Sequence, residues 1–106
     1  MDRNKIEEIA NHYGLENQSR QLIEEMAELT VALNKYHRVF SKEYRTIKDC
    51  AKLETLTMNI AEEMTDVQIM LEQIKFLLGV TVGDIEYIAE NKLKRQIKRM
   101  DKELSS

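Results

Sequence analysis

Two stretches of the chain carry the same arrangement of carboxylates. Glu24-Glu25-Met26-Ala27-Glu28 is matched by Glu62-Glu63-Met64-Thr65-Asp66, and Glu62 follows Glu24 by 38 positions. On a helix, residues at i and i+3 lie one turn apart on the same side. If two helices with this pattern pack antiparallel, four acids converge: Glu25, Glu28, Glu63 and Asp66. Converging carboxylates of this kind predict a cation site.

The electrostatic repulsion among these four carboxylates indicates how strongly they need a compensating positive charge. Two like charges ~6 Å apart repel by ~3 kcal/mol at an effective dielectric constant of ~20. Summed over all pairs, the upper bound is on the order of 10 kcal/mol, comparable with the stability of a whole domain. Either the helices splay so that the acids face solvent, or protons or metal ions compensate the charge. Flexible carboxylate oxygens suit hard cations, so we expect Mg²⁺, with Mn²⁺ as a substitute.

The acids accompany two apolar stripes, each spaced 4-3-4-3-4 as on one face of a helix. The first stripe consists of Leu22, Met26, Leu29, Leu33, Tyr36 and Phe40. The second consists of Ile60, Met64, Val67, Leu71, Ile74 and Leu78. We expect both stripes to face the core, with the acid pairs on their shoulders. That placement distinguishes a site from a solvated acidic surface.

Helix-forming composition dominates the chain, which has no Pro, 3 Gly and 33% charged residues. The periodicity predicts helices over residues 2–13, from 17 to about 38, 47–78 and 82–103. Gly14 should end the first helix, and a bend is expected around residues 55–57, where Thr residues cluster. We therefore predict a single all-α domain over residues 1–106, a four-helix antiparallel bundle. Because 106 residues offer a modest core, we expect oligomerisation to complete it.

Bulk composition excludes several classes of function. A formal net charge of −3 argues against a nucleic-acid partner. The single Cys50 cannot form an internal disulfide, which fits a reducing compartment. The first residues include no apolar signal segment, and no apolar run approaches the ~18 residues of a membrane span. We expect a soluble cytoplasmic protein without a membrane partner.

A di-iron carboxylate site is disfavoured by the same motifs. Such bundles place a His three residues after a Glu, whereas Glu28 and Asp66 occupy those positions here. His12 and His37 lie far from both acidic stretches in the sequence and have no partner motif. They are expected to be surface or interface residues.

The last predicted helix carries a basic face. Lys92, Arg95 and Arg99 share one side of it, and Asn91 adjoins them. An acid-lined metal site beside a basic face is the combination that a polyphosphate requires, because divalent ions and cationic side chains neutralise different phosphate oxygens. The competing interpretation is a solvated cationic face that balances the helix dipole. The residues alone leave both interpretations open.

The paired motifs resemble those of the MazG-type all-α nucleoside triphosphate pyrophosphohydrolases, which carry EExxE followed after a spacer by ExxD. The resemblance covers about residues 17–100, and Lys92-Leu93-Lys94-Arg95 is similar to the family's basic element on the last helix. It implies that the ligands of Mg²⁺ are Glu25, Glu28, Glu63 and Asp66. It also implies that water, activated by the metal and a carboxylate such as Glu24 or Glu25, attacks the α-phosphorus and releases a nucleoside monophosphate and pyrophosphate.

The resemblance further implies how the substrate is held and how the chains assemble. Lys92 and Arg95, with Asn91 and Arg99 beside them, would bind the phosphate chain of a nucleoside triphosphate. The family forms dimers or dimers of dimers, so self-association is expected. One departure is the spacer of 34 residues between Glu28 and Glu63, which is longer than usual and helical in character.

Two alternative functions remain open at this stage. One is a phosphoribosyl-ATP pyrophosphohydrolase, which shares the wider superfamily's architecture. The other is a non-catalytic helical module, in which the acids are solvated and the apolar stripes mediate dimerisation.

Overall fold

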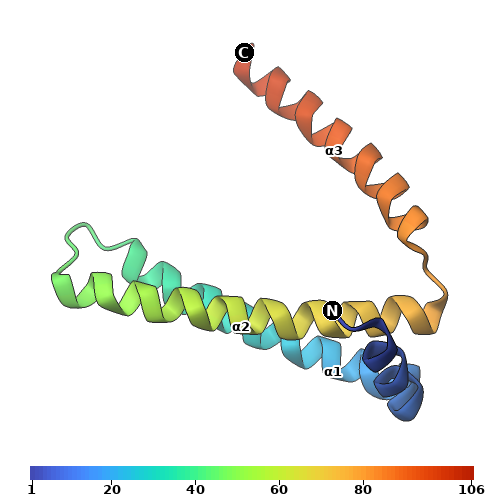
Figure 1. Ribbon diagram of the computed structural model, residues 1–106. Coiled ribbons are helices and arrows are strands. Elements are labelled where there is room, and N and C mark those ends of the chain that lie inside the picture. Colours follow the sequence, from blue (N-terminus) through green and yellow to red (C-terminus); the bar gives the residue numbers. More distant parts are fainter.

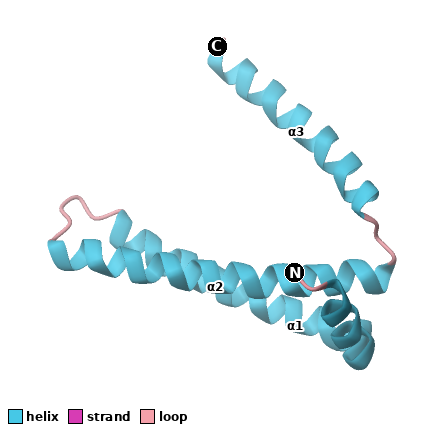
Figure 2. Cartoon of the chain, viewed as in Figure 1, coloured by secondary structure: helices cyan, strands magenta, loops and turns pink.

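The computed structural model describes residues 1–106 and contains three helices and no strand. The helices are α1 (Arg3–Phe40), α2 (Ile47–Leu78) and α3 (Val82–Leu104). In Figure 1, α1 and α2 form a long hairpin, and α3 leaves the end of α2 and points away from it. Figure 2 shows that only short loops join the helices. The all-α prediction is therefore confirmed, whereas a four-helix bundle is not formed within one chain.

The first two predicted helices are joined into the single helix α1, which is kinked at Gly14. The backbone of Gly14 has φ 83° and ψ 169°, a conformation that only glycine adopts without strain. Beyond this kink the N-terminal segment turns away from the axis of the hairpin (Figure 1). Gly14 thus ends the first helical segment as predicted, but no loop separates the segments.

The bend predicted at residues 55–57 is wrong, because α2 is continuous from Ile47 to Leu78. The β-branched Thr57 is accommodated because its hydroxyl donates a hydrogen bond to the Leu53 carbonyl at 2.8 Å. Leu56 is buried against α1, so packing favours the helix at this point. A capping box at Thr46 begins α2, and Gly79, with φ 72°, ends it. These two ends agree with the prediction.

The seam between α1 and α2 consists of two matching rows of buried or half-buried side chains. The α1 row is Gln18, Leu22, Glu25, Leu29, Ala32, Tyr36 and Val39. The α2 row is Leu56, Ile60, Glu63, Val67, Met70, Ile74 and Leu77. Each member of the second row follows its counterpart by 38 positions, so the acidic repeat belongs to a longer repeat that spans the seam. The two helices are therefore pseudosymmetric, and Glu25 and Glu63 occupy equivalent places within the seam.

Half of each predicted apolar stripe lies outside the seam. On α1 and α2 the outward members are 41–58% exposed, and they are Met26, Leu33, Phe40, Met64, Leu71 and Leu78. We call this set the apolar face of the hairpin. The apolar face lies on one side of the seam and Glu28 lies on the other side. This follows from the 3.6-residue repeat, which places Met26 and Glu28 on different sides of α1. The prediction that these six residues face the core of one chain is wrong, because each stripe is wider than the surface that one partner helix covers.

A buried amide pair sets the alignment of the hairpin. The Gln18 side-chain Nε2 donates to the Gln73 Oε1 at 2.7 Å, and both residues are buried. Sliding one helix along the other would leave both amides without partners in an apolar seam, at a cost of about 1–3 kcal/mol for each unsatisfied group. This bond therefore favours the one register that also brings Glu63 level with Glu28, one turn from Glu25.

Helix α3 does not pack on α1 or α2, apart from its first residue Val82, which lines a pocket with Lys75 of α2, and it contains no buried residue. Its apolar side chains follow one face, and they are Ile85, Ala89, Leu93, Ile97, Met100 and Leu104. A capping box of Thr81 and Asp84 starts the helix, as predicted. No helix of the chain combines the length and apolar character needed to cross a membrane.

Candidate metal centre

Three of the four predicted ligands meet near the middle of the hairpin. Carboxylate oxygens of Glu25, Glu28 and Glu63 all lie within 4.8 Å of one another, and we call these residues the acidic triad. Helix α1 supplies two of them one turn apart, and α2 supplies the third from across the seam. The antiparallel pairing and the convergence expected from the repeat are both observed for this triad.

Two oxygens of the triad are buried without a hydrogen-bond partner. They are the Oε2 atoms of Glu25 and Glu63. The other Glu25 oxygen, Oε1, accepts a hydrogen bond from the Gln21 side chain at 2.8 Å. A buried polar atom without a partner costs free energy, and a carboxylate costs more than a neutral group. A cation bound between these oxygens would satisfy both of them.

Mutual repulsion also changes the acidity of the triad. The negative charge of Glu25 raises the pKa of Glu28 above its ordinary value of 4.5, and the charge of Glu63 raises it further. Partial desolvation raises this pKa as well, and so do the hydrogen bonds that a protonated Glu28 can donate to the same two carboxyls. The site therefore retains a proton more readily than an isolated carboxyl does. A divalent cation competes for the same position, since it too relieves repulsion.

The remaining acids lie outside the triad. Asp66 is exposed on α2 and lines a shallow groove with Met58 and Thr65. Its side chain is one methylene shorter than that of Glu28, its counterpart in the repeat, which physically explains why it does not reach the other three. Glu24 is exposed on α1 beside Glu25 and also lies outside the group. Their roles in catalysis and metal binding stay predictions.

The predicted phosphate-binding residues lie on a separate part of the molecule. Asn91, Lys92, Arg95 and Arg99 all belong to α3, which does not pack on the hairpin. Asn91 is half-buried and the three basic residues are exposed. The structure of one chain therefore does not bring the basic face to the acidic triad.

Sequence analysis missed two polar residues that adjoin the triad. Glu28 and Glu63 line a groove of about 350 Å³ together with Lys35 and Asn59. Lys35 follows Glu28 by seven residues and so lies two turns along the same side of α1. That spacing is present in the sequence, but the sequence alone does not show that α2 forms a groove with this side of α1. One groove therefore contains two carboxylates of the triad and a cationic side chain.

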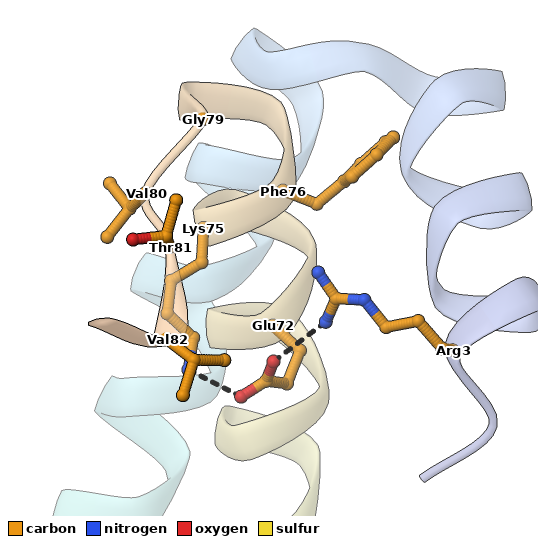
Figure 3. Close-up of a pocket in the computed structure, with 8 residues that line it drawn as sticks. All are labelled: Arg3, Glu72, Lys75, Phe76, Gly79, Val80, Thr81 and Val82. Atoms are coloured by element: carbon orange, nitrogen blue, oxygen red, sulfur yellow. Dashed lines mark hydrogen bonds and ion pairs between the residues drawn. The ribbon is translucent and has the colours of Figure 1, made fainter. Parts of the chain in front are cut away.

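A different pocket, at the open end of the hairpin, has a structural role. Figure 3 shows Arg3 and Lys75 directed at the Glu72 carboxylate. Arg3 Nη1 lies 3.0 Å from Glu72 Oε2, and Lys75 pairs with the other oxygen. The hydrogen bond from Lys75, and then that from Arg3, lower the pKa of Glu72. The charges of this pocket of about 230 Å³ are therefore already paired. The ion pair between Arg3 and Glu72 holds the N-terminal segment against α2.

Comparisons with known proteins add no further constraint on this site. No protein-family model, no curated protein and no solved structure matches the chain. The geometry of the acidic triad and the sequence motifs that form it are therefore the basis for inferring a function.

Proposed function

We propose that this protein is a Mg²⁺-dependent nucleoside triphosphate pyrophosphohydrolase that releases a nucleoside monophosphate and pyrophosphate. The observation that carries the proposal is the acidic triad, in which two buried carboxylate oxygens lack partners. An all-oxygen, flexible carboxylate set of this kind fits Mg²⁺ or Mn²⁺. The substrate class rests on the resemblance of the paired acidic motifs to the MazG-type enzymes.

The residues of the hairpin can be given roles in this reaction. Glu25, Glu28 and Glu63 would hold the ion, with Asp66 as a fourth ligand. Bound Mg²⁺ supplies neutralisation of phosphate charge and a lowered pKa of water. Glu24 is exposed beside the triad and would accept the proton of the attacking water. The new bond forms between that water oxygen and the α-phosphorus, and the bond to the bridging oxygen of pyrophosphate breaks.

Self-association belongs to the same proposal. Both α3 and the apolar face of the hairpin expose apolar side chains that a single chain does not cover. Packing them between copies would complete a four-helix arrangement in a dimer or tetramer. These exposed faces also favour a second candidate function, a non-catalytic helical interaction module. In that case the triad would be an acidic patch without catalytic consequence.

The decisive experiment is an assay of pyrophosphate release from a panel of nucleoside triphosphates with and without Mg²⁺. The proposal expects Mg²⁺-dependent release that Glu63→Gln abolishes. Glu54→Gln is the matched control, because it removes the same charge from α2. Glu54 is exposed and lies outside the triad. Absence of release from every substrate, together with normal self-association, would favour the interaction module.

A further inference from the structure

The groove beside the triad continues into a second groove toward the α1–α2 loop. The second groove, of about 260 Å³, is lined by Lys35, Arg38, Val39, Lys52 and Leu56. It shares Lys35 and Leu56 with the groove that contains Glu28 and Glu63. The two grooves therefore adjoin each other on one face of the hairpin, and together we call them the channel: carboxylates line the part near the triad and basic side chains the part toward the loop. We call the second part the basic groove.

Both helices of the hairpin contribute cations to the basic groove. Lys35 and Arg38 come from α1, and Lys52 comes from the facing part of α2, because the helices are antiparallel. None of the three forms an ion pair or a side-chain hydrogen bond. Two other lysines do have partners, since Lys42 Nζ lies 2.9 Å from Asp49 and Lys75 pairs with Glu72, whereas Lys5 and Lys48 are unpaired but line neither groove. Three unpaired cations around one groove leave their charge free for an anionic ligand.

The spacing along the channel suits a chain of phosphoryl groups. Lys35 lies two turns from Glu28, about 10 Å along α1 at ~1.5 Å per residue, and Arg38 lies about one turn further. A single phosphate held at the triad would leave the cations furthest along the helix without an anionic partner. Linked phosphoryl groups can extend from the triad to these cations, with one end held through a cation at the triad and the other by the guanidinium and ammonium groups.

We propose that Lys35, Arg38 and Lys52 bind the β- and γ-phosphoryl groups of the substrate and retain the pyrophosphate product. This inference rests on the proposed function, and it assigns the phosphate chain to the hairpin instead of the basic face of α3. With the α-phosphorus at the triad and pyrophosphate toward the loop, the nucleoside extends in the opposite direction along the hairpin. Product pyrophosphate should consequently be a competitive inhibitor.

The test uses the full chain and inorganic pyrophosphate as the probe. Binding of pyrophosphate in the presence of Mg²⁺ would be measured by calorimetry for Lys35→Gln, Arg38→Gln and Lys52→Gln. We expect each variant to weaken this binding on the order of 10-fold, since each removes one charge-assisted contact. Binding of Mn²⁺ alone, measured by electron paramagnetic resonance, should change less than 3-fold, because the triad is intact. Circular dichroism would verify that each variant is folded.

Matched controls come from α3, where Lys98→Gln and Lys102→Gln remove the same charge from exposed positions. Equal loss of pyrophosphate binding in the groove variants and in these controls would overturn the inference, because it would show only an effect of net charge. Undiminished pyrophosphate binding in all three groove variants would also overturn it.

Failure of the inference can be told apart from failure of the proposed function. If the wild-type chain releases pyrophosphate but the groove variants bind it normally, the basic groove is wrongly assigned and the activity stands. If the wild-type chain releases none, while pyrophosphate binds and the groove variants lose that binding, the groove is an anion site and the proposed reaction is wrong.

Discussion

The α1–α2 hairpin and helix α3 differ in how their sequence patterns relate to packing. The hairpin holds half-buried carboxylates, as at Glu25 and Glu63, and the buried amide of Gln73 in its seam, while exposing the six residues of its apolar face. Helix α3 separates apolar from charged side chains most sharply of the three helices, yet it buries no residue. Placing charge in a seam is costly and indicates function, whereas an uncovered apolar face indicates a partner. The hairpin therefore combines the properties of a site and of an interface, whereas α3 has only those of an interface.

The largest expected effect comes from neutralising the triad. Glu63→Gln and Glu28→Gln should each lower the rate of pyrophosphate release by more than ~100-fold, because even residues that only support metal ligands cost 10–100-fold when altered. Asp66→Asn should abolish release as well if it completes the ligand set. Thermal melting without metal should show Glu28→Gln to be more stable than wild type, since repulsion is relieved. Normal turnover of these variants would remove the triad from the mechanism.

Binding of Mg²⁺ should stabilise the hairpin specifically. A ligand at 100 times its Kd stabilises a folded protein by ~2.7 kcal/mol, which raises the Tm of a domain of this size by roughly 10–20 °C. The measurement is a melting series at increasing Mg²⁺, with Glu63→Gln as the variant that should not respond. An unchanged Tm for the wild-type chain at millimolar Mg²⁺ would support the interaction module.

Helix α3 should control self-association without changing the ion site. Leu93 is 59% exposed in the middle of the apolar stripe of α3. Leu93→Glu would place a charge in a dry interface, and we expect dimer affinity to fall ~10- to 100-fold. Sedimentation over a concentration series measures this, with Lys98→Glu, on the polar side of the helix, as the control. A chain that stays monomeric at all concentrations would contradict the assignment of α3 as an interface.

The pH dependence of stability should reveal the triad directly. Because the pKa of Glu28 is raised above 4.5, the folded chain binds this proton more tightly than the unfolded chain does. The stabilisation of the fold by this proton is therefore fully present below pH 4.5, and it is lost as pH rises through the pKa of Glu28 in the folded chain. Urea unfolding at a series of pH values without metal should show this decline. Glu28→Gln should remove it, and an unchanged decline in that variant would assign it to another group.

Asp49, in the capping box of α2, gives stability the opposite dependence on pH, at lower pH values. Hydrogen bonds from Thr46 and Lys42 hold the pKa of Asp49 at about 2, below its ordinary value of 3.8. Its contribution is present above that ordinary value and is lost as pH falls from about 4 toward 2. Without metal, stability should therefore be greatest near the upper end of this window, before the charge on Glu28 develops.

The repeat predicts the site better than it predicts the packing. The 38-residue offset was sufficient to predict the antiparallel pair and the meeting of Glu25, Glu28 and Glu63, because both follow from helix geometry. The orientation of the apolar stripes could not be predicted, since a wide stripe allows several seams. Only tertiary contacts, including the Gln18–Gln73 bond, select one. The apolar stripe of α3 predicts a helix but not its position, because within one chain it packs on neither α1 nor α2.

The smallest expected effect compares two nearly identical helix caps. Thr46 Oγ1 and Thr81 Oγ1 each accept a hydrogen bond of 3.1 Å, from the backbone N–H of Asp49 and of Asp84. Thr46→Ala should lower the free energy of unfolding by ~1 kcal/mol, because α2 folds together with α1. In dilute solution Thr81→Ala should cost much less, since unfolding of the hairpin does not require α3.

Comparing the two variants at different protein concentrations tests whether α3 is stabilised by contacts between copies of the chain. If α3 packs between copies, the cost of Thr81→Ala should rise toward that of Thr46→Ala in concentrated solution, because unfolding and dissociation become coupled. Urea titrations of both variants at low and high protein concentration measure this difference. Equal costs at every concentration would show that α3 is coupled to the hairpin within one chain, and the division of the molecule into a site and an interface would then be wrong.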